Sequence, residues 1–123
     1  MNEKTVLIIE DEEDAAELFA EMMRVSGFRV LKTSSGAPAL AMMSNEKPDI
    51  VILDIMMPEI DGYTVNTRLQ EKDETRSIPV IILTAKGQMR DLFALGTNIV
   101  AFMEKPFDPK GLRDKIRELL TVK

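Results

Sequence analysis

The sequence has 123 residues, the length of one ordinary domain. It contains neither cysteine nor histidine, which excludes disulfides, thiolate metal sites, His-dependent nucleophilic catalysis and nearly all zinc chemistry. The formal net charge of −5 argues against nucleic acid as a direct partner. Carboxylates, lysines, hydroxyls and any metal ion that they recruit are the groups left for chemistry.

No apolar run approaches the ~20 residues that a membrane span requires. The N-terminus lacks the pattern of a signal peptide, so we expect a cytoplasmic protein with no membrane contact. No segment has the composition of a linker or a repeat, which predicts a single domain over residues 1–123.

The first half of the chain alternates apolar runs with segments of helical period. Thr5–Ile9 predicts a strand, Glu12–Ser26 a helix ended by Gly27, and Phe28–Thr33 a second strand. A short helix over roughly Ala37–Ser44 has Pro38 in its first turn. The first helix is expected to bury one face, made of Ala15, Leu18, Phe19, Met22 and Val25.

The second half continues the alternation. Ile50–Leu53 is uniformly apolar and predicts a strand buried on both faces. The remaining expected elements are a turn at Pro58–Gly62, a helix with Val65 and Leu69 inward, a strand Val80–Leu83, a short helix Gln88–Leu95, a strand Val100–Met103, and a helix capped by Asp108. The last helix has a core stripe of Leu112, Ile116, Leu119 and Leu120.

Five strand-then-helix units predict an α/β fold with a parallel sheet, because parallel strands need crossover connections. We expect one doubly wound domain with helices on both faces of the sheet. If the first strand lies beside the third, the strand order is the flavodoxin-like 2-1-3-4-5.

Residues suited to phosphate or metal chemistry follow four of the five expected strands: Glu10 and Asp11, Asp54, Thr84, and Lys105. In open α/β sheets, ligands bind at the carboxyl ends of the strands, where strand order reverses. Two carboxylates about 4 Å apart repel by ~4 kcal/mol at an effective dielectric of ~20, so the cluster calls for a cation. Mg²⁺, or Mn²⁺ in its place, suits carboxylate and phosphate oxygens.

The same residues suggest roles in phosphoryl transfer. Asp54 is the expected nucleophile, Thr84 supplies a hydroxyl, and Lys105 supplies a positive charge for phosphoryl oxygens. Taken singly, each of these residues is more often a helix cap, a solvated acid or a surface charge. Their succession at four strand ends is what favours the functional interpretation.

The motifs involved are Glu10-Asp11, Asp54-Ile55-Met56-Met57-Pro58 with Asp61-Gly62, Thr84-Ala85, and Lys105-Pro106-Phe107. With them the chain resembles, over its full length, the receiver domain of two-component response regulators. The resemblance implies that Asp54 accepts a phosphoryl group from the phosphohistidine of a histidine kinase or phosphotransfer protein. It also implies that Glu10, Asp11, Asp54 and the backbone carbonyl of Met56 arrange Mg²⁺.

Further roles follow from the resemblance. Thr84 and Phe102 would form a switch pair, and Lys105 would bind the phosphate and precede a cis peptide to Pro106. Met56 and Lys86 would flank the path of the attacking water and tune the lifetime of the phosphoryl group. The resemblance also implies a downstream effector, whose identity the sequence does not specify, and leaves a phosphorylation-dependent dimer open.

One departure from the family concerns the segment between Thr84 and Lys105, which is one residue shorter than expected. Gly96 comes early, so the helix Gln88–Leu95 looks truncated and a longer loop, Thr97–Ile99, precedes the last strand. Receivers often carry their output surface there, which puts that surface in question. The given sequence carries no effector domain, so we expect either a stand-alone receiver or an excised domain.

Two alternatives to a signalling module remain. The first is an enzyme, a small Mg²⁺-dependent phosphatase of the haloacid dehalogenase type, which also forms an aspartyl phosphate. That class needs a second Asp two residues after a nucleophile at the end of the first strand, and Glu10-Asp11-Glu12-Glu13 lacks this pattern. The second is a flavin or nucleotide carrier, whose phosphate loop after the first strand is rich in Gly, Ser and Thr rather than acidic.

Overall fold

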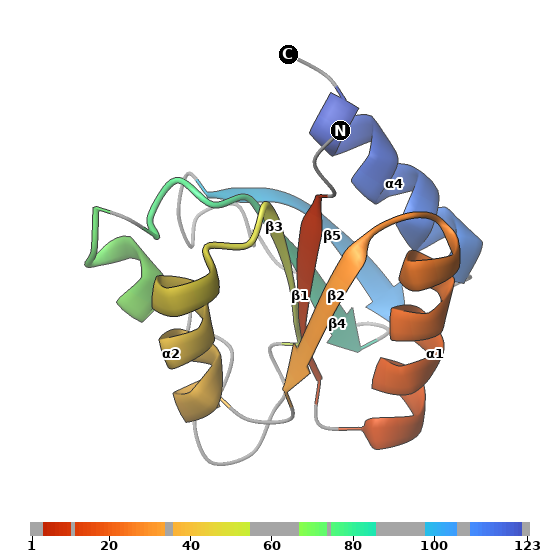
Figure 1. Cartoon of the computed structure of the whole chain (residues 1–123), viewed down its shortest axis with the longest axis horizontal. Coiled ribbons are helices and arrows are strands. Elements are labelled where there is room, and N and C mark those ends of the chain that lie inside the picture. Colours follow the sequence, from red (N-terminus) through yellow and green to blue (C-terminus); the bar gives the residue numbers. More distant parts are fainter. Residues whose placement is uncertain are drawn as a thin grey trace.

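A computed structural model describes residues 4–10, 12–33, 36–54, 67–73, 75–85, 98–105 and 109–121. Its elements are β1 (Thr5–Ile9), α1 (Glu13–Val25), β2 (Arg29–Thr33), α2 (Gly36–Glu46), β3 (Ile50–Asp54), β4 (Val80–Ala85), β5 (Ile99–Lys105) and α4 (Pro109–Thr121) (Figure 1). Residues 67–70 are also helical.

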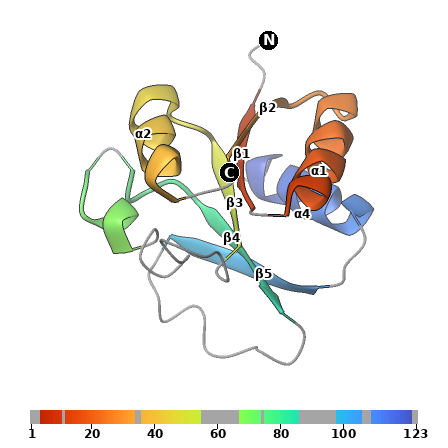
Figure 2. The same ribbon diagram turned by 90° about the horizontal axis from the view of Figure 1, so that it is seen from below.

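The five strands form one sheet in the order β2-β1-β3-β4-β5, and every neighbouring pair is parallel. This confirms the predicted doubly wound fold. Figure 2 shows α1 and α4 on one face of the sheet and α2 with the helical residues 67–70 on the other. Each parallel connection crosses from one end of the sheet to the other. The carboxyl ends of all five strands therefore lie at the same end of the sheet, called the carboxyl edge below.

The core consists of two apolar layers, one on each face of the sheet. Successive residues of a strand point to opposite faces, so each central strand contributes to both layers. The layer beneath α1 and α4 includes Val6, Ile8, Ile50, Ile52, Ile81, Leu83, Leu112 and Ile116. The layer beneath α2 includes Leu7, Ile9, Val51, Leu53, Leu69, Val80 and Ile82. β3 is therefore buried on both faces, as its apolar sequence predicts.

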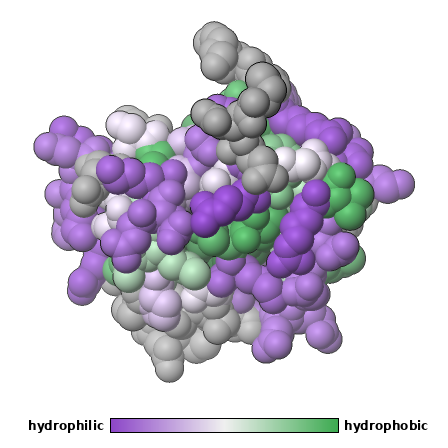
Figure 3. All heavy atoms as spheres, viewed as in Figure 1, coloured by the Kyte–Doolittle hydropathy of each residue, from purple (hydrophilic) through white to green (hydrophobic). Residues whose placement is uncertain are grey.

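The edge strand β2 is more open than the central strands. Arg29 is exposed, and the four other residues of β2 are half-buried. In the view of Figure 3, hydrophilic side chains cover the helices and apolar side chains gather between them. Within the described part of the chain, no helix is long and apolar enough to cross a membrane.

The buried face of α1 differs from the one expected from the sequence. Its buried residues are Ala16, Phe19, Ala20 and Met23, whereas Leu18 is 55% exposed and Val25 is 76% exposed. The buried face includes two small residues, Ala16 and Ala20, and the helix is rotated so that Leu18 and Val25 lie outside it. The prediction was wrong for Leu18 and Val25, although Ala15 and Met22 still pack partly against the core.

The strand β5 begins one residue earlier than expected and contains an irregularity near its start. Ile99 pairs with Val80, but Ala101 pairs with Ile81, so Val100 is an extra residue between the two pairs. Ile99 therefore belongs to the strand, which corrects the prediction that it ends a loop. Such an insertion bends the strand and realigns the residues that follow it.

Other boundaries agree with the sequence to within a few residues. α2 starts at Gly36 with Pro38 in its first turn, and β3 and β4 run on to include Asp54 and Ala85. Leu112 and Ile116 of α4 are fully buried, while Leu119 and Leu120 pack at the margin. Four further expectations lie outside the described residues: the turn Pro58–Gly62, Val65, the helix Gln88–Leu95 and the cap Asp108.

The two faces of α1 should respond differently to truncation. Met23→Ala removes a fully buried side chain and should destabilise the protein by about 2–5 kcal/mol. Val25→Ala on the exposed face should change stability by no more than about 0.5 kcal/mol. Urea unfolding monitored by circular dichroism measures both values, and equal losses would contradict the observed orientation of α1.

Candidate functional site

Two buried carboxylates lie at the carboxyl edge of the sheet. Asp54 is the last residue of β3 and is 2% exposed, and Glu10 directly follows β1 and is 1% exposed. β1 and β3 are hydrogen-bonded neighbours, with Ile9 level with Leu53. One residue further along both strands, Glu10 comes level with Asp54.

The parity of the strands places both acids on the same face. Ile8 and Ile52 belong to the core layer beneath α1 and α4, and residues two positions apart on a strand share a face. Glu10 and Asp54 therefore follow them on that face, on strands that run ~4.8 Å apart. Two carboxylate oxygen donors at this spacing suit a hard divalent cation.

A cavity of about 270 Å³ borders Glu10, and its lining comprises Glu10, Glu13, Ala16, Lys32 and Thr33. The carboxylate oxygen Oε2 of Glu10 accepts a hydrogen bond from the backbone N–H of Glu12, 3.2 Å away. The backbone N–H of Glu10 donates to the backbone oxygen of Thr33 at 3.1 Å. These two bonds fix the chain where it leaves β1 and turns into α1.

A cation borders this cavity that sequence reasoning did not single out. Lys32, near the end of β2, forms an ion pair with Glu17 of α1. The hydrogen bond from Lys32 and its charge, with a smaller contribution from Arg24, hold the pKa of the Glu17 carboxyl below its usual range. The signal that could have found Lys32 is the strand order itself, because β2 flanks β1 and ends at the same edge.

Three other expected site residues lie on β4 and β5, on the side of β3 opposite β1. Asp54 is level with Leu83 of β4, so Thr84 is the next residue along that strand. On β5, Lys105 is level with Ala85 and Phe102 is level with Ile82. The sheet thus brings the ends of β1, β3, β4 and β5 together in the predicted arrangement.

The remaining residues of the expected site are Asp11, Met56, Lys86 and Pro106, which lie outside the described residues. Within the described ranges, no group of three or more acidic residues is arranged to hold a metal ion. Glu10 and Asp54 are the two of the three expected acidic ligands that the structure describes. Their burial and oxygen chemistry fit a divalent cation, and the roles of all these residues stay predictions.

Comparisons with known proteins agree with this arrangement. The family model described as the response regulator receiver domain matches residues 6–117. Among curated proteins, the response regulator SaeR of Staphylococcus aureus is 38% identical over 117 residues, which cover 94% of this chain and 50% of SaeR. The chain therefore spans about half the length of the curated relatives that it matches.

Solved structures show the same fold. A structure described as a response regulator from Chloroflexus aurantiacus has a TM-score of 0.87 at 30% identity and covers 98% of this chain and 100% of its own. The receiver domain of the sensor histidine kinase PA1611 from Pseudomonas aeruginosa, solved with a magnesium ion coordinated in its active-site cleft, has a TM-score of 0.87 at 22% identity, with 98% and 100% covered. On the family match, the identity to SaeR and the shared fold, this chain belongs to the receiver domains of response regulators.

Proposed function

We propose that this chain is a phosphorylation-dependent signalling switch that accepts a phosphoryl group on Asp54. The observation that carries the proposal is the pairing of Glu10 and Asp54, both buried, at the carboxyl edge of adjacent strands. Two neighbouring carboxylates repel each other, and a divalent cation that both can ligate relieves this repulsion. Membership of the receiver family supports the same function.

A divalent cation, Mg²⁺ or Mn²⁺, is the cofactor that suits this donor set. Glu10, Asp11, Asp54 and the backbone carbonyl of Met56 would hold it. The magnesium ion in the receiver of the Pseudomonas aeruginosa kinase supports this assignment. When bound, the cation would neutralise charge on the carboxylates and on an incoming phosphoryl group.

Phosphoryl transfer would then use residues of this chain in distinct roles. A carboxylate oxygen of Asp54 attacks the phosphorus of a phosphohistidine, the N–P bond breaks, and an acyl phosphate forms. The Thr84 hydroxyl donates a hydrogen bond to a phosphoryl oxygen, and the Lys105 ammonium pairs with another. Thr84 is the residue after Leu83, which is level with Asp54. Lys105 is level with Ala85, the residue after Thr84.

The partners follow from this chemistry. The donor is a histidine kinase or a phosphotransfer protein, and the reader is a downstream effector. The protein acts in the cytoplasm as a signalling module, without turnover of an external substrate. Met56 and Lys86 would tune how long the phosphoryl group persists by controlling the approach of water.

Phosphorylation should occur at Asp54 alone. Incubation with acetyl phosphate and Mg²⁺ should add the mass of one phosphoryl group to the wild type and none to Asp54→Asn. Intact-mass spectrometry measures both. A phosphate gained by Asp54→Asn would refute Asp54 as the sole acceptor, and rapid turnover of a generic phosphate ester by the wild type would favour the phosphatase.

Removing a charge from the acidic pair should stabilise the metal-free protein. Asp54→Asn keeps the shape of the side chain while it ends the repulsion with Glu10, so the free energy of unfolding should rise by about 1 kcal/mol or more, below the ~4 kcal/mol of an uncompensated pair. Mg²⁺ should stabilise the wild type by about 2.7 kcal/mol at one hundred times its dissociation constant.

Urea unfolding of both proteins, with and without Mg²⁺, measures these effects. They should not add, because each relieves the same repulsion and Asp54→Asn also loses a metal ligand. A metal-free Asp54→Asn protein less stable than the wild type, or a wild type indifferent to Mg²⁺, would be incompatible with a shared metal site.

The phosphorylated state should be read through Thr84 and Phe102. Movement of the Thr84 hydroxyl towards the phosphoryl group vacates space, which the Phe102 ring turns inward to fill. NMR chemical shifts on adding beryllofluoride, a phosphoryl mimic, should therefore extend along β4 and β5. Shifts confined to residues 54–62 would show that these strands do not transmit the signal.

A further inference from the structure

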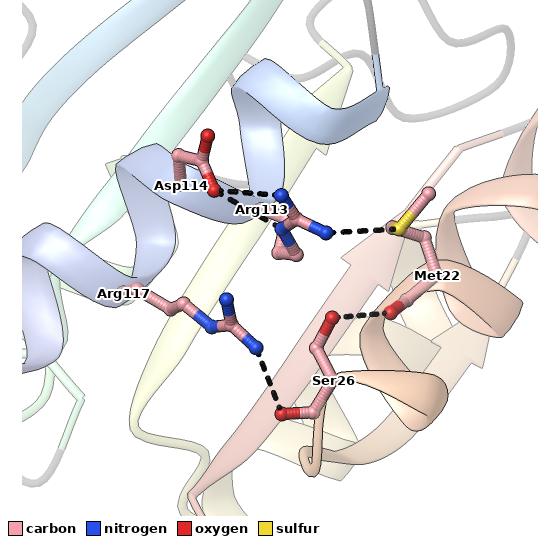
Figure 4. A network of polar contacts seen from close by, with 5 residues as sticks. All are labelled: Met22, Ser26, Arg113, Asp114 and Arg117. Atoms are coloured by element: carbon pink, nitrogen blue, oxygen red, sulfur yellow. Dashed lines mark hydrogen bonds and ion pairs between the residues drawn. The ribbon is translucent and has the colours of Figure 1, made fainter.

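Two arginines of α4 contact the C-terminal end of α1, as Figure 4 shows. Arg117 donates from Nη2 to the backbone oxygen of Ser26, 3.4 Å away. The Ser26 hydroxyl in turn donates to the backbone oxygen of Met22 at 2.9 Å. The last carbonyls of a helix carry the negative end of its dipole, so cations at this position are favourable.

The second arginine, Arg113, divides its donors between two partners. Its Nε and Nη2 each lie 3.0 Å from the carboxylate oxygen Oδ1 of Asp114. Its Nη1 lies instead 3.9 Å from Sδ of Met22 (Figure 4). A thioether sulfur is a weak acceptor, so most of the hydrogen-bonding capacity of Nη1 is unused in this contact.

We propose that Met22 is a reversible oxidation site whose sulfoxide is bound by Arg113. The oxidant is a peroxide: the sulfur lone pair of Met22 attacks one oxygen of hydrogen peroxide, an S–O bond forms as the O–O bond breaks, and the other oxygen leaves with both hydrogens as water. The sulfur loses two electrons and the peroxide gains them. The new sulfoxide oxygen is a strong acceptor, and rotation of the Met22 side chain can direct it to Nη1, from which it receives a charge-assisted hydrogen bond.

Burial selects Met22 over the methionine beside it. Met23 is fully buried in the layer beneath α1, whereas Met22 lies at the margin of that layer. Met22 is only partly buried, which leaves it more accessible to a small oxidant than Met23. A methionine sulfoxide normally disrupts apolar packing, but at Met22 the Arg113 guanidinium already provides a polar partner.

The site is separate from the acidic pair. Glu13 and Ala16, at the N-terminal end of α1, line the cavity beside Glu10, whereas Met22 and Ser26 lie at the other end of the helix. The proposal therefore does not rest on the function proposed for Asp54. Acceptance of a phosphoryl group from acetyl phosphate should be the same before and after oxidation of Met22.

Peptide mapping after limited treatment with hydrogen peroxide tests the selectivity. Met22 should be converted to the sulfoxide at least tenfold faster than Met23, which serves as an internal control on the same helix. Conversion of Met23 at the same rate, or a Met22 that stays a thioether throughout, would overturn the proposal.

A double-mutant cycle tests the role of Arg113. Met22→Leu removes the oxidisable sulfur at similar volume, and Arg113→Leu removes the donor while it keeps an apolar stem. Urea unfolding measures the coupling between the two positions as a ratio of unfolding equilibrium constants. Oxidation should raise this coupling about tenfold, as expected for one hydrogen bond to a charged group. Oxidation of other methionines is common to all four proteins and cancels.

Two controls make the cycle specific. Coupling of Met22 to Arg117, measured with Arg117→Leu, should change little on oxidation, because Arg117 contacts Ser26 rather than the sulfur. Methionine sulfoxide reductase should return the Met22–Arg113 coupling to its starting value. If Arg113→Leu does not fold, Arg113→Lys replaces it and should lose only part of the gain. A coupling that oxidation leaves unchanged or weakens would refute the proposal.

Discussion

The alignment of β1 with β3 is the constraint on which the rest of this structure depends. Ile9 lies level with Leu53, so Glu10, which follows β1, and Asp54, which ends β3, come next at the same height and on the same face. A shift of one residue in either strand would send one carboxylate to the opposite face. The chemistry proposed for Asp54 is possible only because this pairing is held.

The core enforces that pairing. Both strands are apolar and buried on both faces, so each residue must fit beneath either α1 and α4 or α2. Ala16 and Ala20 are buried on the face of α1 that packs on the core, and Glu13 in the first turn of the same helix lines the cavity beside Glu10. Packing of these apolar layers thus determines the surroundings of the two acids, and burial of apolar side chains is the main source of stability.

Charge is distributed unevenly along α1. Its first turn is acidic and borders the cavity beside Glu10, while Lys32 neutralises Glu17 one turn further on. Its last turn instead receives two arginines from α4. The helix α1 therefore has an acidic N-terminal end beside Glu10 and a C-terminal end that two arginines of α4 contact.

Alternating apolar runs and helical periods were enough to predict the α/β class, and motifs at the strand ends were enough to locate the acids, Thr84 and Lys105. Both signals are local, because they depend on residue type and short spacing. The outward orientation of Leu18 and Val25, the extra residue Val100, and the contacts of Lys32 and Arg113 could not be predicted from the sequence. Each depends on which elements pack together: α1 has apolar residues on overlapping faces, and only its packing against the sheet decides that Ala16, Phe19, Ala20 and Met23 are the buried ones.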